Sequence, residues 1–304
     1  MGYIINPYWI EGGGASLPLA DRWRIVALGN QWDSCWLAEI EMAQTAAGAD
    51  ECTGGTPTDY GSTGTIANLF DNNTGTSYQT GAYNVGTTRP GYVFASALQI
   101  AEVRLTADAT RGAAAPTAFA IQASLDAGVT WNTYGLHITH GLFANGEQKS
   151  FAVDPTPIPT GLGRTNARAW RVNVSNNNGA SWTQIGELRM ATSAGGADIC
   201  TGGAPYCNGT LSHVFADRSP AAAFDNNTAT GAQSNATNNM KLGYVFPGAQ
   251  DIYEVRMTIS TLDTNGGPLD FTVEYTEDFV NWTVANTFTG VTGWSAGTYK
   301  TFVV

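Results

Sequence analysis

The amino-acid sequence predicts an all-β protein made of two tandem β-sandwich domains. Short runs rich in Val, Ile, Tyr, Phe and Trp alternate with polar, glycine-rich turns, a pattern typical of sandwiches and barrels. Long amphipathic helical patterns are missing from the sequence. The 304 residues match the length of about two average domains, and the chain repeats itself once.

The repeat keeps the order of its segments through most of the chain. Its period of roughly 150 residues is a whole domain and far too long for a solenoid unit. The segments that correspond are 38–55 with 186–203, 91–94 with 243–246, 101–106 with 253–258, 119–131 with 271–282, and 149–153 with 300–304.

Within each copy the residues alternate as expected for half-buried strands. "VRLTAD" and "VRMTIS" place apolar side chains on one face, and so do "FAIQAS" and "FTVEYT". Each of the last two runs leads through an acidic turn into Trp131 or Trp282, which predicts a hairpin. We expect both tryptophans to pack within their hairpins and not to stack on a ligand, since large aromatic side chains usually bury most of their area.

The second copy ends at Val304 without the "AWRVNV" and "GELRM" segments that close the first copy. Similar segments, "RWRIVALGN" and "AEIEM", stand near the N-terminus, where Trp23 corresponds to Trp170. The sequence therefore predicts a continuous domain at 48–193 and a discontinuous, circularly permuted domain made of 20–47 and 196–304. Closure within one chain is favoured over a swap between subunits, because the termini of a domain often lie close together.

Residues 1–19 have no counterpart in the repeat and are predicted to form an N-terminal arm. The stretch "EGGGASLP" is typical of a flexible tether, and "YIINPYWI" is aromatic and apolar. We expect this arm to contact other proteins of an assembly, and we expect the chain to form a homo-oligomer.

Composition excludes several classes of partner. The net charge of -11 and the scarcity of Lys argue against nucleic acid, which requires clusters of Lys and Arg. The sequence shows neither a stretch suited to membrane insertion nor a signal-peptide pattern at its start. We expect no enzymatic activity, because common catalytic motifs are missing and "HITH" at 137–140, if it is a strand, places its histidines on opposite faces.

The cysteines leave two alternatives open. Cys200 and Cys207 are near enough in sequence for a local disulfide, with Cys35 and Cys52 as the remaining pair. Four reduced thiols are equally compatible with a protein made in cytoplasm. The spacing of these residues does not fit a metal site.

Two polar segments, "FDNNTGT" at 70–76 and "FDNNTAT" at 224–230, stand at corresponding places in the two copies. We call them knot 1 and knot 2. Each collects carboxylate, amide and hydroxyl oxygens in one turn, which suits a hard cation. The alternative is a hydrogen-bonded Asx turn without metal.

The order of the knot, "GYVF", "EVR", the hairpin tryptophan and "GELRM" resembles the discoidin, or coagulation-factor type C, family. The resemblance covers both copies and implies a galactose-binding-like jelly-roll fold. It also implies a structural calcium in each knot, completed by a glutamate on the closing strand. The implied ligands are Asp71, Asn73, Thr76 and Glu187 for knot 1, and Asp225, Asn227, Thr230 and Glu39 for knot 2. Asn72 and Asn226 depart from the family, in which glycine is common at this place.

The resemblance also implies that loops at one end of each sandwich bind carbohydrate. Aromatic side chains beside Asn, Asp and Arg suit the C–H faces and hydroxyls of a sugar. The candidates are Tyr78, Tyr83, Arg89, Asn177 and Trp182 for the first copy, and Trp32, Asp33, Asn235, Asn238 and Lys241 for the second. The alternative is that these residues belong to ordinary polar loops.

Two functions are consistent with these observations. The first is a non-catalytic carbohydrate-binding adhesion protein on the surface of a phage or phage-like particle, which recognises host cell-surface glycans as its receptor. The second is a structural decoration or connector protein of a virion that uses the same fold without binding sugar. A virion or otherwise extracellular location is expected, because modules of this family act outside cells.

Overall fold

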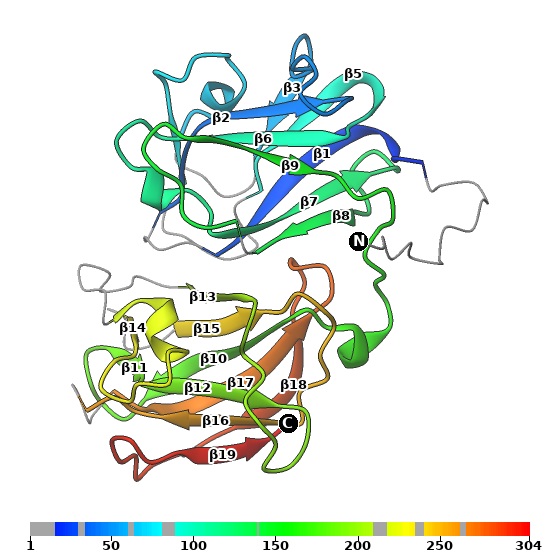
Figure 1. Cartoon of the computed structure of the whole chain (residues 1–304). Coiled ribbons are helices and arrows are strands. Elements are labelled where there is room, and N and C mark those ends of the chain that lie inside the picture. The colour runs from blue at the N-terminus through cyan, green and yellow to red at the C-terminus, as the bar shows by residue number, and fades with distance from the viewer. Residues whose placement is uncertain are drawn as a thin grey trace, which may run out of the picture.

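The structure is a computed structural model. It describes residues 16–29, 34–59, 64–80, 89–138, 140–208, 218–234, 240–261 and 266–304. Two β-sandwich domains follow one another along the chain, one above the other in Figure 1, and the predicted all-β class is confirmed. The helices in the described parts of the chain are single 3-10 turns, and none of them is long enough to cross a membrane.

The first domain contains a five-stranded sheet in the order β3-β5-β1-β7-β8 and a four-stranded sheet in the order β4-β2-β6-β9. Its strands are β1 Leu19–Gly29, β2 Trp36–Ala43, β3 Thr56–Thr58, β4 Tyr78–Gln79, β5 Gly91–Gln99, β6 Glu102–Ala107, β7 Ala118–Ser124, β8 Asn132–His137 and β9 Gln148–Ala152, and its 3-10 turns are η1 Ile66–Leu69 and η2 Gly112–Ala114.

The second domain contains a five-stranded sheet in the order β13-β15-β10-β17-β18, opposed by β12-β16-β19 and the pair β11-β14. Its strands are β10 Ala169–Asn177, β11 Thr183–Ile185, β12 Glu187–Ala191, β13 Ala204–Asn208, β14 Ala232–Ser234, β15 Met240–Val245, β16 Glu254–Thr258, β17 Pro268–Thr276, β18 Thr283–Phe288 and β19 Lys300–Val303, and its 3-10 turns are η3 Gly163–Asn166 and η5 Pro220–Ala223.

The five-stranded sheets of the two domains match strand for strand, with β1 in the place of β10 and β7 in the place of β17. The alternation of apolar residues explains this arrangement. Trp23 and Ile25 point into the first sandwich, and Trp170 and Val172 take the same positions in the second, all at most 1% exposed. Burying these apolar faces between two sheets provides the main stabilisation of each domain.

The predicted discontinuous domain is wrong. β1 pairs with β5 on one side and with β7 on the other, so residues 20–47 complete the first domain and not the second. β10 pairs with β15 and β17, so the segment 169–191 opens the second domain and does not close the first. Each domain is therefore continuous, because its opening strand is the centre of its own five-stranded sheet.

The predicted arm at 1–19 extends too far toward the first domain, because its last residues belong to that domain. β1 begins at Leu19, and Leu17 packs against the core of the first domain. The Leu17 carbonyl also accepts a hydrogen bond of 2.8 Å from the Gln99 side chain. Residues 1–15 lie outside the described residues, and the role predicted for them stays a prediction.

The two domains pack against each other through their five-stranded sheets, which lie on the facing sides in Figure 1. Tyr206 and Phe279 of the second domain are fully buried and belong to the hydrophobic core cluster of the first. Phe279 has a φ of 64°, an unusual conformation for a bulky side chain that the surrounding packing must maintain. The Gln122 side chain donates a 2.9 Å hydrogen bond to the Asp278 carbonyl across the same interface.

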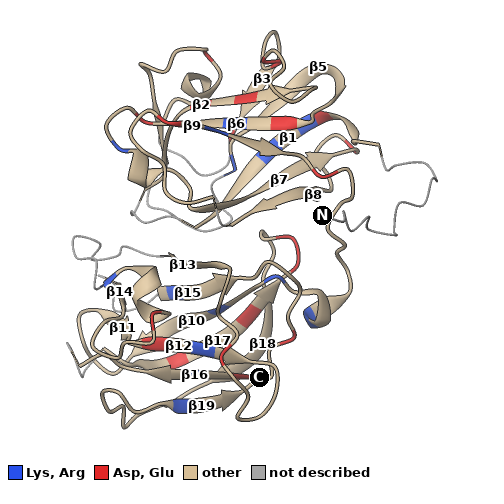
Figure 2. Cartoon of the chain, in the orientation of Figure 1, with Lys and Arg blue, Asp and Glu red and all other residues tan. Residues whose placement is uncertain are grey.

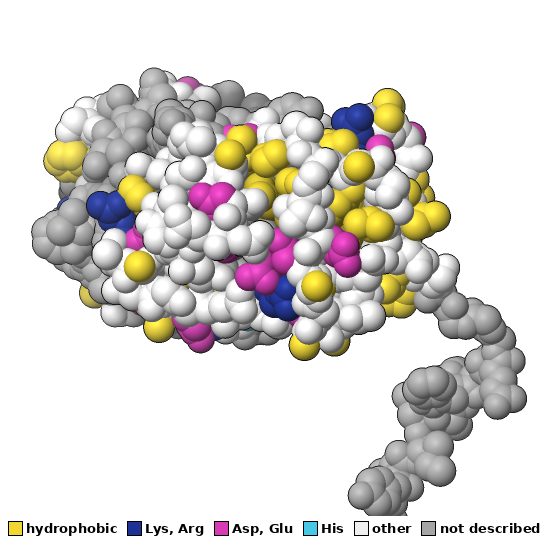
Figure 3. All heavy atoms as spheres, turned by 90° about the horizontal axis from the view of Figure 1, so that it is seen from above, with side chains coloured by type: hydrophobic (Ala, Val, Ile, Leu, Met, Phe, Trp, Pro, Cys, Tyr) yellow, Lys and Arg dark blue, Asp and Glu magenta, His cyan; other side chains and the backbone are white. Residues whose placement is uncertain are grey.

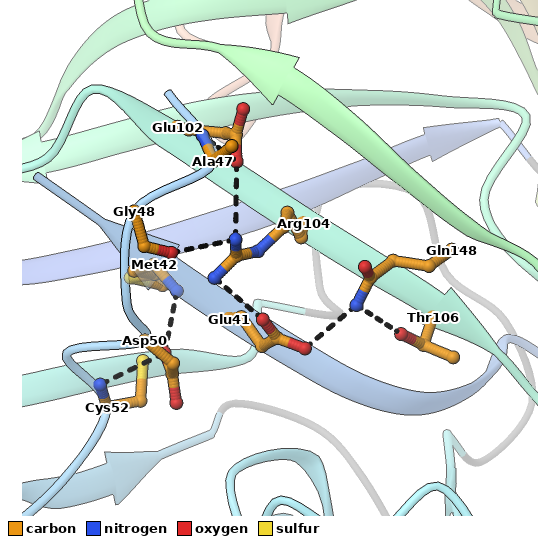
Figure 4. Close-up of polar contacts among 10 residues, drawn as sticks. All are labelled: Glu41, Met42, Ala47, Gly48, Asp50, Cys52, Glu102, Arg104, Thr106 and Gln148. Atoms are coloured by element: carbon orange, nitrogen blue, oxygen red, sulfur yellow. Dashed lines mark hydrogen bonds and ion pairs between the residues drawn. The ribbon is translucent and has the colours of Figure 1, made fainter. Parts of the chain in front are cut away.

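An ion-pair network fastens the loop after β2 to the four-stranded sheet of the first domain (Figure 4). Arg104 lies 2.7 Å from Glu41 and 3.6 Å from Glu102, and it donates to the Gly48 carbonyl. Asp50 accepts the backbone N–H groups that precede and follow the loop. The second domain repeats these contacts, with Arg256 beside Glu254 and Asp198 in the place of Asp50. We assign this network a structural role.

Charged side chains are sparse on the described surface. Figure 2 shows Lys and Arg scattered over both domains, with acidic residues close to several of them. Figure 3, which views the first domain from the side away from the second, shows acidic groups beside a basic one, amid uncharged and hydrophobic atoms. The expectation that nucleic acid is not a partner stays a prediction from composition.

The four cysteines are buried thiols in the structure, and neither of the two possible disulfides is formed. Burial raises the pKa of the Cys35 thiol to about 12 and raises the pKa of Cys200 well above its usual value. Buried neutral thiols react slowly, because the thiolate is the reactive form. We expect a thiol reagent such as DTNB to leave the native chain unlabelled and to titrate four thiols after denaturation without reductant. A titration of two thiols or none in denaturant would contradict the structure.

Candidate functional sites

Knot 1 is a closed hydrogen-bonded turn between η1 and β4. Asp71 Oδ1 accepts the backbone N–H of Asn73 at 2.9 Å, and Asp71 Oδ2 lies 2.9 Å from the Thr76 hydroxyl. That hydroxyl is also 2.7 Å from the Asn73 carbonyl. Asn72 has a φ of 55°, the left-handed conformation that Asn tolerates better than most residues other than glycine. Asn72 therefore adopts the backbone conformation of this turn without a glycine.

Knot 2 has the same geometry. Asp225 Oδ1 accepts the Asn227 N–H at 2.8 Å, and Asp225 Oδ2 lies 2.9 Å from the Thr230 hydroxyl. Asn226 has a φ of 61°, as its counterpart in knot 1 does. The structure therefore brings together the knot residues that the sequence predicted, in both domains.

The glutamates assigned to the knots must be exchanged. Glu39 Oε1 accepts the Asn73 N–H of knot 1 at 3.0 Å, and Glu187 Oε1 accepts the Asn227 N–H of knot 2 at 3.0 Å. The predicted pairing of Glu187 with knot 1 and Glu39 with knot 2 is wrong. Glu39 lies on β2 of the first domain and Glu187 on β12 of the second, so each belongs to the same continuous domain as the knot that it contacts.

Each knot holds a buried glutamate close to an aspartate at the surface. Glu39 is 2% exposed and Glu187 is 1% exposed. The pKa of Glu39 is raised to about 7, mainly by burial and secondly by the contact with Asp71. Burial and the contact with Asp225 raise the pKa of Glu187 to about 7 in the same way. Two carboxyls in such a place share a proton or bind a cation.

The donor set fits a hard cation. Each knot offers two carboxyl groups, an amide side chain, a threonine hydroxyl and backbone carbonyls, the oxygen ligands that calcium takes in sets of six to eight. Groups of three or more His, Cys, Asp or Glu side chains able to hold a metal are absent among the described residues. A cation in either knot would therefore depend on carbonyl and hydroxyl oxygens as well as on the carboxylates.

The loop residues predicted to bind sugar do not form an exposed aromatic platform where the structure describes them. Tyr78 is 1% exposed and donates to Asp59, because β4 pairs with β2 and turns this ring into the core. Asn177 is 4% exposed, and its amide braces its own loop through the carbonyls of Ala180 and Trp182. Neither side chain is exposed to a ligand, so the structure does not support a role for Tyr78 or Asn177 in binding sugar.

The other predicted loop residues have mixed outcomes. Arg89, Trp182 and Lys241 are half-buried, and Arg89 lines a pocket described next. Tyr83, Trp32, Asp33, Asn235 and Asn238 lie outside the described residues, and their predicted role stays a prediction.

A pocket of about 560 Å³ lies between the two domains. Arg24, Arg89 and Trp131 are among the residues that line it from the first domain. From the second domain it is lined by Tyr275, Thr276, Glu277, Asp278, Val280, Asn281 and Thr283. The Arg24 guanidinium lies over the Trp131 ring, 3.8 Å from the ring centroid. Threonine hydroxyls and the amides of Gln122 and Asn281 are also in the wall. We call this the interdomain pocket.

The sequence did not identify the interdomain pocket. Trp131 was expected to pack within its hairpin, and it does so in part, since its indole N–H donates to the Gly128 carbonyl at 3.1 Å. The only indication of this site in the sequence is the pair of tryptophans, Trp131 and Trp282, which follow an acidic turn in each copy. The sequence does not show how the two domains pack against each other. That packing places Trp131, and not Trp282, among the residues that line the pocket.

The "HITH" segment has a structural role, although not in the predicted geometry. β8 ends at His137, so the expected alternation does not reach His140. Both imidazoles lie within 6 Å of the Phe119 ring, with centroid distances of 5.1 and 5.7 Å, and also contact Phe151. Burial lowers the pKa of His140 to about 4. The histidines therefore lie on the same side of the domain, as neutral parts of an aromatic cluster.

Comparisons with models of known families, with curated proteins and with solved structures found no match for this chain. The function must therefore be argued from the sites themselves.

Proposed function

We propose that this protein is a non-catalytic carbohydrate-binding protein and that the interdomain pocket is its binding site. The observation that carries the proposal is the composition of the pocket wall. Trp131 lines the pocket together with residues that carry guanidinium, amide, hydroxyl and carboxylate groups. The volume falls within the range of about 300–1,000 Å³ found for small-molecule sites.

A saccharide suits this wall better than an apolar ligand. Sugar hydroxyls both donate and accept hydrogen bonds, and the wall offers donors such as Arg89 together with acceptors such as Glu277 and Asp278. The C–H face of a sugar ring packs on an aromatic ring such as Trp131. An apolar ligand would instead leave these polar groups without water or partners, which is costly.

We further propose that each knot holds a structural calcium ion. Asp71, Asn73, Thr76 and Glu39 would hold it in the first domain, and Asp225, Asn227, Thr230 and Glu187 in the second. The positive charge would offset the buried glutamate of each knot and the aspartate beside it. Calcium here stabilises the turn and takes no part in chemistry.

The resemblance to discoidin-type domains supports a role in adhesion. We propose that the protein acts on the surface of a phage or phage-like particle and recognises host glycans, with the N-terminal segment contacting other particle proteins. The competing function is a decoration or connector protein that binds no sugar.

A glycan array with the full chain separates these functions. We expect binding to a defined set of glycans, and we expect Trp131→Ala to abolish it. Trp36→Ala is the matched control, because Arg111 lies over the Trp36 ring as Arg24 lies over Trp131, and Trp36 does not line the pocket. A folded wild-type chain that binds no glycan would contradict the proposed function and favour the structural role.

A further inference from the structure

The outer strands of the two five-stranded sheets, β8 and β18, correspond residue for residue. Thr133 is opposite Gln122 in the first domain, and Val284 is opposite Glu274 in the second, with a shift of register at the same place in both pairs. Each of these strands is the last in its sheet. A difference between their outer edges therefore comes from what the rest of the chain places beside them.

The outer edge of β8 is covered by the segment that follows β9. The Asp154 N–H donates to the Tyr134 carbonyl at 2.6 Å, and the Ile158 N–H donates to the Thr133 carbonyl at 2.8 Å. Thr133 and Ile158 form an antiparallel bridge, and Thr133 is 1% exposed. The covering segment, "DPTPI" at 154–158, contains two prolines. Proline suits an outermost position, because it has no N–H to donate to a further strand.

The outer edge of β18 is open where the structure describes its surroundings. Its backbone pairs with β17 on one side, and no described segment takes the place on the other side that 154–158 takes beside β8. Val284, the counterpart of Thr133, is 51% exposed, and Val303 on the neighbouring β19 is 50% exposed. The sequence of β18, "TVANTF", carries no charge. An uncharged open edge with apolar side chains beside it is a site at which another extended segment can pair.

The N-terminal segment of the same chain approaches this edge. β1 begins at Leu19, and the Arg22 side chain lies beside Gly128. Gly128 and Thr283, the first residue of β18, both line the interdomain pocket. The start of β1 and the start of β18 are therefore on the same side of the molecule. Residues 1–15, which precede the described part of the chain, span up to about 50 Å when extended.

The sequence of the N-terminal segment suits the edge of β18. "YIINPYWI" at 3–10 is rich in the β-branched and aromatic residues that strands favour, and it carries no charge. Its proline is compatible with an outermost strand, as are the two prolines beside β8. "EGGGAS" at 11–16 joins it to the first domain as a flexible tether.

We propose that residues 3–10 dock on the outer edge of β18 of their own chain, as the segment 154–158 docks on β8. The carbonyls of Val284 and Ala285 accept hydrogen bonds from the docked segment, since they correspond to the carbonyls that accept in β8. The segment then links the first domain to the outer side of the second. Its own outer edge and aromatic side chains face other proteins of an assembly. This inference does not depend on sugar binding.

Hydrogen exchange resolved by segment, measured on the full chain, tests the docking. We expect the amides of residues 3–10 to exchange at least roughly tenfold more slowly than those of a free peptide of the same sequence, because hydrogen-bonded amides exchange only when the segment opens.

Two matched variants locate the docked segment. Val284→Lys should remove most of the protection of residues 3–10, because docking would bury the new charge. Leu142→Lys is the control, since Leu142 is 49% exposed and lies in the first domain, and it should keep the protection. Thermal melting of both variants verifies that they are folded, as expected for substitutions at exposed positions.

Three results would overturn the inference. Exchange of residues 3–10 as fast as in the free peptide would show that the edge of β18 stays open. Protection that persists in Val284→Lys would place the segment elsewhere. Protection that rises with protein concentration, together with a dimer in light scattering, would assign the segment to a second copy and not to its own chain.

Discussion

Calcium should raise the melting temperature of both domains, and a chelator should reverse the rise. A ligand that binds the folded state alone stabilises it by about 4 kcal/mol when its concentration is 1,000 times its dissociation constant. Since each domain has one knot of the same geometry, both unfolding transitions should shift. Differential scanning calorimetry with calcium and with EGTA measures the effect.

The knots also predict how stability depends on pH in the presence of chelator. The pKa of Glu39 rises from 4.5 to about 7 on folding, and that of Glu187 does the same. Between these values the folded domain keeps a proton that the unfolded chain has lost, so stability falls as pH rises through this window. We expect a loss of about 2 kcal/mol per domain between pH 5 and pH 8, since the partly solvated loop screens the charge.

Two variants assign these effects to the corrected pairs. Glu39→Gln should remove the calcium response and the pH dependence of the first domain and leave those of the second. Glu187→Gln should do the converse, so each variant is the control for the other. Melting that ignores calcium, chelator and pH in the wild-type chain would show that the knots are hydrogen-bonded turns without metal.

The sequence predicted the knots well because their geometry is local. Asp71, Asn73 and Thr76 are within six residues of one another, and Asp, Asn and Thr close such turns through their own side chains. The all-β class was predictable for a similar reason, since the two-residue alternation of a run such as "VRLTAD" is fixed within the strand itself.

The domain boundaries were not predictable in the same way. The chain contains two copies of an opening segment and two copies of a knot segment. Such a chain can be divided into two continuous domains, or into one continuous domain enclosed by a discontinuous one. The sequence at Trp23 and Trp170 is alike in both divisions. Strand pairing decides between them, and it joins β1 to β5 and β7 over a sequence distance that local patterns do not encode.

The interdomain pocket was missed because it depends on how two domains pack. Trp131 and Trp282 look equivalent in sequence, and both have an arginine over the ring at 3.8 Å. The Trp282 ring centroid lies 6.0 Å from that of the buried Tyr206, and Trp282 packs against the first domain. Trp131 instead lines the pocket. The difference between them arises at an interface between residues more than 100 positions apart.

Replacing either central tryptophan should destabilise its own domain and spare the other. Trp23 and Trp170 are both fully buried, and each donates its indole N–H to a carbonyl of its own domain, Ala20 at 3.2 Å and Gln250 at 2.8 Å. Truncating a buried tryptophan to alanine costs about 3–5 kcal/mol, a large part of the 5–15 kcal/mol that stabilises a typical domain. Hydrogen exchange resolved by segment measures the effect in each domain.

In Trp23→Ala we expect the amides of β5 and β7 to lose protection while those of β15 and β17 keep it, and in Trp170→Ala we expect the reverse. Trp23→Phe is the control, because it fills most of the volume and should lose much less stability. Under the discontinuous division Trp23→Ala would instead expose β15 and β17, since that division assigns Trp23 to the sandwich that contains them. Equal loss of protection in all four strands would show that the buried contacts of Tyr206 and Phe279 join the two domains into one cooperative unit. That result would contradict independent domains while still placing Trp23 between β5 and β7.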